Sequence, residues 1–149
     1  MKYKFCILIS LFIILVSCNK SAIHQGMSSD EFSNSISKIP HFAYLNYCFF
    51  TDENDIPTVV TLSKDASTVE SVKTFKKANP TNEDFKKIIS GMTIYEVVEL
   101  VGLPYESASF GQISMNFHAS EGHFFTIDWS EENSQIKVLS CNGPYEIAS

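Results

Sequence analysis

The chain has 149 residues, of which 11 are basic and 17 are acidic, so its formal net charge is −6 at neutral pH. Every basic residue is a lysine, and there is no basic stripe or arginine of the kind that contacts nucleic-acid phosphates and bases. These features exclude nucleic acid as an expected partner, and the length suits one domain or two very small ones.

The N-terminal segment has the pattern of an export signal. Lys2 and Lys4 precede an apolar run over 5–16, which is shorter than the roughly 20 residues that a membrane-spanning helix needs. The sequence LVSC then ends at Cys18 and resembles the lipobox of bacterial lipoproteins. That resemblance implies transfer of a diacylglyceryl group to the Cys18 thiol, cleavage after Ser17, acylation of the new amino terminus with fatty acids such as palmitate, and a place at the extracytoplasmic face of the cell membrane. The alternative is an ordinary signal peptide in which the cysteine occurs by chance.

These features divide the chain into four parts. We expect a lipoprotein signal peptide over 1–17, a lipidated tether over 18–28, an N-terminal helix and meander over 29–79, and a second such region over 80–149. Loss of the two signal lysines changes the formal charge from −6 to −8. An acidic surface gives no polybasic support for membrane binding, so membrane lipid is expected as a partner only through acylated Cys18.

Two cysteines remain for the folded region. Cys48 and Cys141 lie in strand-like segments, and export places them where a disulfide is permitted. A bridge between them is one prediction, and two buried free thiols are the other.

The N-terminal region reads as one helix followed by three strands. Ser28 and Glu31 form a capping-box pattern, and Pro40 stops the helix that they start. Strand-like stretches follow over 41–50, 57–62 and 68–75, with an acidic turn over 52–55. The step from Val72 to Phe75 breaks strict alternation, so a bulge or an early strand end is expected there.

The C-terminal region reads as a helix–turn–helix followed by three more strands. The first helix is expected from Thr81 to Gly91, and Thr93 with Glu96 caps the second, which Gly102 ends. Strand-like stretches then cover 112–118, 123–129 and 135–141. The predicted fold class is α+β, a two-layer arrangement of the helix–turn–helix on an antiparallel meander. The order of elements also suggests a duplicated helix-plus-meander unit, with coincidence as the alternative.

The stretch FKKIISGMTIYEVVELVGLPYE, followed by a meander, carries a family resemblance. It resembles the BamE/OmlA-like lipoprotein domain and the related repeat of the β-lactamase inhibitor protein, over roughly residues 81–141. The resemblance implies a non-catalytic module whose partner is an outer-membrane assembly machine in one branch and an inhibited secreted enzyme in the other. The composition, rich in lysine, asparagine and isoleucine, suggests an AT-rich genome and a Gram-positive surface, where a role in an outer membrane would not apply.

No motif in the chain points to catalysis. The His118–His123 turn offers two histidines and Glu121, but the neighbouring sequence offers no fourth zinc ligand. We therefore interpret these as surface turn residues. The acidic turn lacks the glycine and distal glutamate of an EF-hand, and nucleophile and phosphate-loop motifs are absent from the sequence. We therefore expect no catalytic residue, no metal and no cofactor.

Aromatic residues suggest where a partner binds. Alternation places Tyr47 and Phe49 on the opposite strand face from Phe42, and Phe124 on the opposite face from Phe125. We expect Tyr47, Phe49 and Phe124 to form a surface for an unidentified envelope or secreted protein, so the predicted function is a lipid-anchored protein-binding or scaffolding module. The alternative is an inhibitor of a secreted or cell-wall enzyme, which would use a rigid loop at 104–112 or 52–56.

Overall fold

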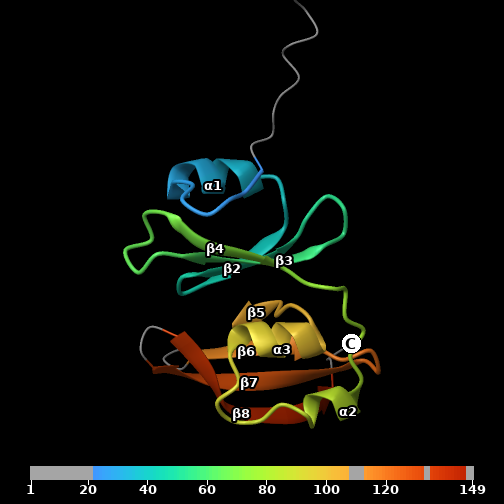
Figure 1. The fold of residues 1–149 in the computed structure, drawn as a ribbon. Helices are drawn as coiled ribbons and strands as arrows, with labels where there is room; N and C mark the ends of the chain where they lie inside the picture. The colour runs from blue at the N-terminus through green and yellow to red at the C-terminus, as the bar shows by residue number, and fades with distance from the viewer. Residues whose placement is uncertain (1–21, 108–112, 133–134, 147–149) are drawn as a thin grey trace, which may run out of the picture.

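The chain folds into a mixed α+β structure with two antiparallel sheets of four strands (Figure 1). The computed structural model describes residues 22–107, 113–132 and 135–146. In sheet 1 the strands are β1 (His41–Tyr44), β2 (Tyr47–Thr51), β3 (Pro57–Leu62) and β4 (Val69–Thr74). In sheet 2 they are β5 (Glu106–Ser107), β6 (Ile113–His118), β7 (His123–Glu132) and β8 (Gln135–Glu146). Each sheet is a meander, because its strands are neighbours in chain order.

Within the described residues, three helices accompany the sheets. They are α1 (Ser29–Ile36), α2 (Asn82–Phe85) and α3 (Ile94–Val101). The α1 and α3 helices both start with the predicted capping box, in which the N-cap hydroxyl accepts from the backbone of the glutamate three residues later. Gly102 caps α3 at the predicted position, with a φ of 84°. The prediction for α2 was wrong in length, because this helix ends at Phe85 and the chain continues to Gly91 outside regular helix.

The predicted meanders of three strands were also wrong, since each sheet has four. The expected strand over 41–50 is a hairpin, in which β1 and β2 are joined at Leu45 and Asn46. In the C-terminal half the short strand β5 precedes the predicted three. Of the bulge or early end expected in the third strand, the structure shows the early end, because β4 ends at Thr74 and the register shift lies at Thr61 and Leu62 of β3.

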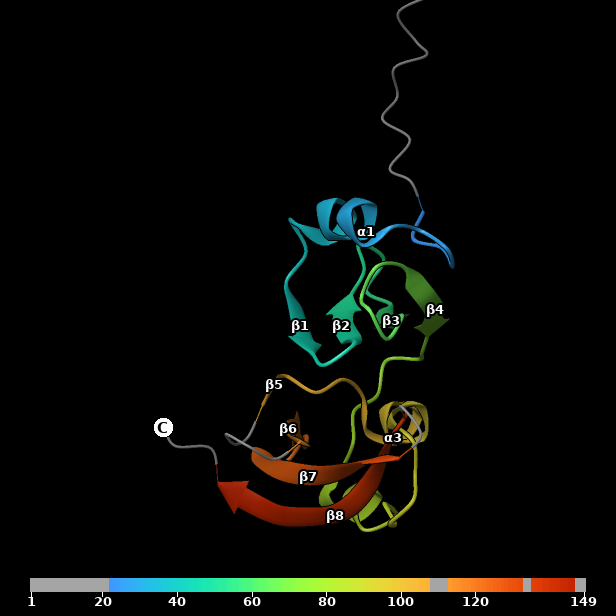
Figure 2. The same ribbon diagram turned by 90° about the vertical axis from the view of Figure 1, so that its left-hand side faces the viewer.

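Both faces of sheet 1 contribute side chains to an apolar core. One face packs against α1 in an N-terminal core, whose buried members are Met27, Phe32, Ile36, Cys48, Phe50, Val60 and Val69. The other face contributes Tyr47, Phe49 and Val59 to a second cluster, which we call the junction core. Figure 2 shows α1 above sheet 1 and the C-terminal half below it. A single two-layer arrangement therefore does not describe the whole chain.

The junction core joins the two halves of the chain. From α3 it contains Ile94, Val97, Val98 and Val101, and from sheet 2 it contains Met115, Phe117, Phe125, Ile127, Trp129, Ile136 and Val138. The alternation in β7 is as predicted, with Phe125, Ile127 and Trp129 on the buried face. Because this apolar cluster runs without interruption from sheet 1 to sheet 2, we expect the halves to unfold together.

The residues before α1 belong to the folded region. Gly26 N donates to Val69 O, and Val69 N donates back to Met27 O, each at 2.8 Å. Met27 is 2 % exposed in the N-terminal core. The predicted tether over 18–28 was therefore wrong at its C-terminal end, because these residues pair with the start of β4.

The same local structure recurs before α3. Gly91 N donates to Val138 O, and Val138 N donates to Met92 O, again at 2.8 Å. Gly26 and Gly91 both have a positive φ, of 86° and 92°. The α1 and α3 helices are thus each preceded by a glycine and a methionine that pair with the last strand of the sheet that follows.

Candidate binding surfaces

The face of sheet 2 that points away from the junction core is polar. Because side chains alternate along strands, the residues between the core positions share this face. They are Ser114 and Asn116 of β6, Thr126 and Asp128 of β7, and Ser140 and Asn142 of β8. The register places them in two cross-strand rows, Ser114–Asp128–Ser140 and Asn116–Thr126–Asn142. We call this set the polar face of sheet 2.

Hydrogen bonds fix the side chains of both rows. The Asp128 carboxylate accepts from Ser114 Oγ at 2.6 Å, from Ser140 Oγ at 2.8 Å and from Asn142 Nδ2 at 2.9 Å. In the neighbouring row, Thr126 Oγ1 donates to Asn116 Oδ1 at 2.7 Å, and Asn116 Nδ2 donates to Glu106 of β5 at 3.0 Å. The two networks hold these side chains in one arrangement, with Ser114 and Asn116 buried and Asn142 exposed, so the face is ordered before any partner arrives.

Aromatic rings lie at one end of the polar face. Phe124 and Tyr145 have ring centroids 5.2 Å apart, and Tyr105 stacks on His118 at 3.9 Å. Tyr145 is 44 % exposed. Burial, and then the neighbouring Glu106 carboxylate, raise the pKa of Tyr105, so its hydroxyl stays protonated. The face thus combines ordered polar groups with accessible aromatic surface.

The surface predicted from the aromatic pattern was wrong at two of its three residues. Tyr47 is 5 % exposed and Phe49 is 1 % exposed, because both lie in the junction core beneath the C-terminal half. Burial is also the main reason why the pKa of Tyr47 is raised, with a smaller contribution from Tyr95. Phe124 is half-buried and lies with Tyr145 at the polar face.

Of the two alternatives for the cysteines, the structure shows free thiols and no bridge between Cys48, which is buried, and Cys141, which is half-buried. Cys48 is buried in the N-terminal core, between sheet 1 and α1. Cys141 packs against the junction core, which lies on the opposite face of sheet 1. Burial raises the pKa of each thiol to about 11, with a further contribution from Asp128 at Cys141. A thiol with a raised pKa is a poor nucleophile near neutral pH, so neither position has the character of a catalytic cysteine.

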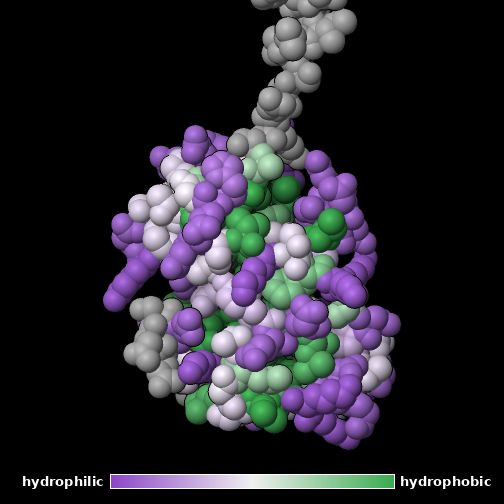
Figure 3. Space-filling model, viewed as in Figure 1, coloured by the Kyte–Doolittle hydropathy of each residue, from purple (hydrophilic) through white to green (hydrophobic). Residues whose placement is uncertain are grey.

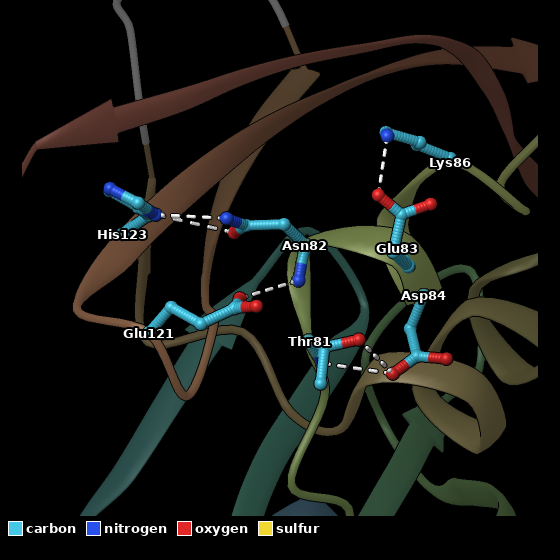
Figure 4. Close-up of polar contacts among 7 residues, drawn as sticks. All are labelled: Thr81, Asn82, Glu83, Asp84, Lys86, Glu121 and His123. Atoms are coloured by element: carbon cyan, nitrogen blue, oxygen red, sulfur yellow. Dashed lines mark hydrogen bonds and ion pairs between the residues drawn. The ribbon is translucent and has the colours of Figure 1, made fainter.

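The residues of the histidine-containing turn hold α2 in place (Figure 4). Asn82 N at the first position of α2 donates to a Glu121 carboxylate oxygen at 2.6 Å, and the Asn82 side chain contacts His123 Nδ1 at 3.0 Å. His118 lies apart from them, stacked on Tyr105. In the part of the chain that the structure describes, no group of three or more potential ligands is arranged to hold a metal ion.

The start of α2 is further stabilised by a capping box. The Asp84 carboxylate accepts from the Thr81 backbone and hydroxyl, and Lys87 pairs with its other oxygen at 2.6 Å. The Lys87 ammonium and these Thr81 bonds lower the pKa of Asp84 to about 2. The ionised form of Asp84 therefore supports α2 at neutral pH, and this support is lost as the pH falls from about 4 towards 2.

The acidic turn before β3 is a compact, hydrogen-bonded loop. Asp52 Oδ1 accepts from the backbone of Asn54 at 2.8 Å and of Ile56 at 2.9 Å, and Asp55 pairs with Lys77 at 2.5 Å. Ile56 is 38 % exposed next to this loop. The other loop considered for inhibition covers 104–112. Its residues 108–112 lie outside the described residues.

A groove lies between the end of β4 and the outer side of α3. It has a volume of about 550 Å³, and its apolar lining comes from Phe75, Met92, Tyr95 and Leu100. Lys73 lies over the Tyr95 ring with Nζ 3.8 Å from the ring centroid, and Glu99 lines the groove from α3. Figure 3 shows this side of the molecule, where hydrophobic and hydrophilic residues adjoin between the two layers.

The predicted signal peptide, the acylation site Cys18 and the first residues of the predicted tether lie outside the described residues. Across the described ranges, none of the helices has the length and apolar character needed to cross a membrane.

Comparisons with protein-family models, with curated proteins and with solved structures found no match for this chain. The functional assignment therefore depends on the surfaces described above.

Sequence reasoning missed most of the polar face. Asn142 and Tyr145 were not considered because the last strand was expected to end at Cys141, whereas β8 continues to Glu146. Gly143 and Pro144 are residues that normally argue against a strand. The alternation of Ser114 and Asn116 with Met115 and Phe117 was a readable signal for a face opposite the core.

Proposed function

We propose that this protein is a lipid-anchored, extracytoplasmic protein-binding module without catalytic activity, and that it binds its partner through the polar face of sheet 2. The observation that carries the proposal is the hydrogen-bonded network around Asp128, with the Phe124–Tyr145 pair beside it. Tyrosine, serine and asparagine are residues that binding surfaces of antibodies favour, and tyrosine gives a large contact area at low entropic cost. Aromatic side chains are likewise enriched at protein interfaces.

The position of the polar face suits an anchored protein. The described chain begins at Ala22 beside α1, whereas sheet 2 forms the opposite end of the molecule (Figures 1 and 2). If Cys18 carries the lipid, the four residues 18–21 span at most about 14 Å when fully extended. The N-terminal half would then lie close to the membrane, and sheet 2 would be the part that a partner meets first.

We also propose that the chain is a duplicated helix-plus-meander unit of the BamE-like type, in which a helix packs on the sheet that follows it. Support comes from Gly26-Met27 and Gly91-Met92, which precede the two capping boxes and make equivalent hydrogen bonds to Val69 and Val138. In each half four antiparallel strands follow a capped helix, α1 or α3, which is consistent with the same origin, and the short α2 is additional in the second half. This relationship supports a binding role, although a fold by itself carries no function.

A second candidate function is inhibition of a secreted or cell-wall enzyme. The specific observation in its favour is the compact turn at Asp52, because an inhibitory loop must hold its shape inside an active site. Ile56 next to that turn would be the apolar residue offered to the enzyme.

Replacement of Cys18 with serine tests the anchor. Because the acidic chain offers the membrane no second attachment, Cys18→Ser should move the protein from the membrane fraction to the soluble fraction without unfolding it. The measurement is cell fractionation, with circular dichroism of the released protein as the check on folding. Retention of folded Cys18→Ser protein in the membrane would contradict the single-anchor proposal.

Capture of partners from native membranes tests the polar face. A charge placed at Asn142 should disrupt the face without entering a core, since Asn142 is exposed. We expect Asn142→Lys to lower recovery of the partner at least tenfold relative to the native chain. Ile89→Ser serves as the matched control, because Ile89 is 66 % exposed and lies in the segment before α3. Equal recovery with Asn142→Lys and Ile89→Ser would refute the assignment of this face.

A further inference from the structure

The edge of sheet 1 next to the groove has a definite hydrogen-bonding pattern. Phe75 N donates to Pro57 O at 2.8 Å, and the register pairs Lys73 with Val59 and Ser71 with Thr61. In antiparallel strands, pairs that exchange hydrogen bonds alternate with pairs that do not. Lys73 and Ser71 therefore direct their backbone groups towards β3, and Val72 and Thr74 direct theirs away from the sheet.

The N-terminal segment occupies only the beginning of this edge. Residues Gly26, Met27 and Ser29 make backbone hydrogen bonds to Ser67 and Val69. Beyond Val69, the described part of the chain supplies no backbone partner for the outward groups of Val72 and Thr74. Such an edge is a template for pairing with another strand.

The groove lies directly beside this open edge. Thr74 at the end of β4 and the following Phe75 line one side of it, and Met92, which precedes α3, lines the other side with Tyr95 and Leu100 of α3. A strand added to β4 would direct every second side chain into the groove and the others away from it. A volume of about 550 Å³ is within the range of sites that hold several side chains.

Charge at the groove favours a basic segment. The only basic residue in its lining is Lys73, which is engaged over the Tyr95 ring, whereas both Glu96 and Glu99 line the groove. The Glu96 carboxylate is used to cap α3, with bonds from Thr93 N at 2.7 Å and Thr93 Oγ1 at 2.9 Å. The exposed Glu99 is thus the carboxylate best placed to pair with a lysine or arginine of the incoming chain.

We propose that the edge of β4 binds an extended segment of a partner protein by strand addition, with alternate apolar side chains in the β4–α3 groove and a basic residue next to Glu99. Strand addition obtains affinity from backbone hydrogen bonds and specificity from pockets for every second side chain. This surface is distinct from the polar face of sheet 2, so its failure and the failure of the proposed function are measured separately.

The probe is the acetylated and amidated peptide KVTVTVTVK with a fluorescent label, titrated with the purified, detergent-solubilised full protein and followed by fluorescence anisotropy. Two further peptides carry N-methyl groups on the valine amides or on the threonine amides. Alternate amides of a strand point to opposite edges, so only one of these peptides loses its bonds to β4. We expect the two to differ in affinity by about tenfold or more. Equal affinities would overturn the proposal, as would no binding of any peptide up to about 1 mM.

Variants of the protein locate the bound peptide. Thr74→Pro removes one outward N–H, so the affinity for KVTVTVTVK should fall by about tenfold. The variant should still fold, because proline is tolerated at sheet edges. Glu99→Lys changes an exposed residue and is the second variant, should Thr74→Pro fold poorly. It should weaken KVTVTVTVK several-fold and strengthen EVTVTVTVE, whereas Ile89→Ser should change neither. A Glu99→Lys protein that binds both peptides as the native chain does would place the peptide elsewhere and overturn the proposal.

Discussion

Replacement of Gly143 with alanine is expected to lower the free energy of unfolding by about 3 kcal/mol. A Cβ at this position would lie 2.7 Å from Phe125 Cδ1 and 3.1 Å from the Phe124 carbonyl oxygen. The Phe125 ring has no space to withdraw, because it stacks on Phe85 of α2 with centroids 4.0 Å apart. The φ of 142° adds backbone strain for any residue with a Cβ. Denaturation in urea, monitored by fluorescence, measures the loss.

Gly122→Ala is the matched control for this variant. Gly122 also has a positive φ, of 81°, but a Cβ there would meet no atom within 4 Å. The control therefore retains the backbone strain and removes the clash, and it should cost about 1 kcal/mol. If the two alanine variants are equally stable, Phe125 does not pack against Gly143 as described.

Removal of the Tyr95 side chain is expected to have a comparable effect, because this residue connects the two halves. From α3, its ring stacks on Phe75 and contacts Tyr47 edge to face. Its hydroxyl bonds to Thr61 and, at 3.1 Å, to Ser71, both in sheet 1. Tyr95→Ala should therefore lower the free energy of unfolding by about 3 kcal/mol. Chemical denaturation followed by both circular dichroism and tryptophan fluorescence would show the loss as one shifted transition.

Tyr95→Phe separates the hydroxyl from the ring. It leaves the ring contacts in place but deprives Thr61, which is 6 % exposed, of its partner, at a cost of about 1–2 kcal/mol. Tyr145→Phe changes the same group at a position that is 44 % exposed and should alter stability by less than about 0.5 kcal/mol. A Tyr95→Phe variant as stable as Tyr145→Phe would show that the hydroxyl does not join the halves.

The elements that depend on local sequence could be predicted. The N-cap at Thr93, its partner Glu96 and the end of α3 at Gly102 were all identified correctly. Capping involves residues within one turn of each other, so the sequence pattern contains the whole interaction. The turn at Asp52 was correct for the same reason, since its hydrogen bonds span at most four residues.

Features that depend on contacts distant in sequence could not be predicted. The α2 helix ends early, and the chain after it is directed towards β8, where Gly91 and Met92 pair with Val138. The burial of Tyr47 and Phe49 follows from the packing of the C-terminal half on sheet 1, which strand alternation does not reveal. An apolar strand face gives the same alternation in the sequence whether it is buried against a second layer or exposed for binding.

One signal was readable and was missed. Gly26-Met27-Ser28 with Glu31 repeats as Gly91-Met92-Thr93 with Glu96 at the same spacing. This repeat was missed because the residues up to 28 were interpreted as a tether. In the structure, the repeat corresponds to a glycine with positive φ, of 86° at Gly26, followed by the buried Met27. The polar face of sheet 2 was harder to find, because its last strand passes through Gly143 and Pro144.

Site-specific cross-linking in intact cells tests the central claim most directly. A photoreactive phenylalanine analogue at Tyr145 lies at the aromatic end of the polar face, and the same analogue at Ile89 lies outside it. We expect one discrete protein adduct from the analogue at position 145 and no such adduct from position 89. The adduct from position 145 should disappear in a protein that also carries Asn142→Lys. The same adduct from both positions, or no protein adduct from position 145, would contradict the central claim.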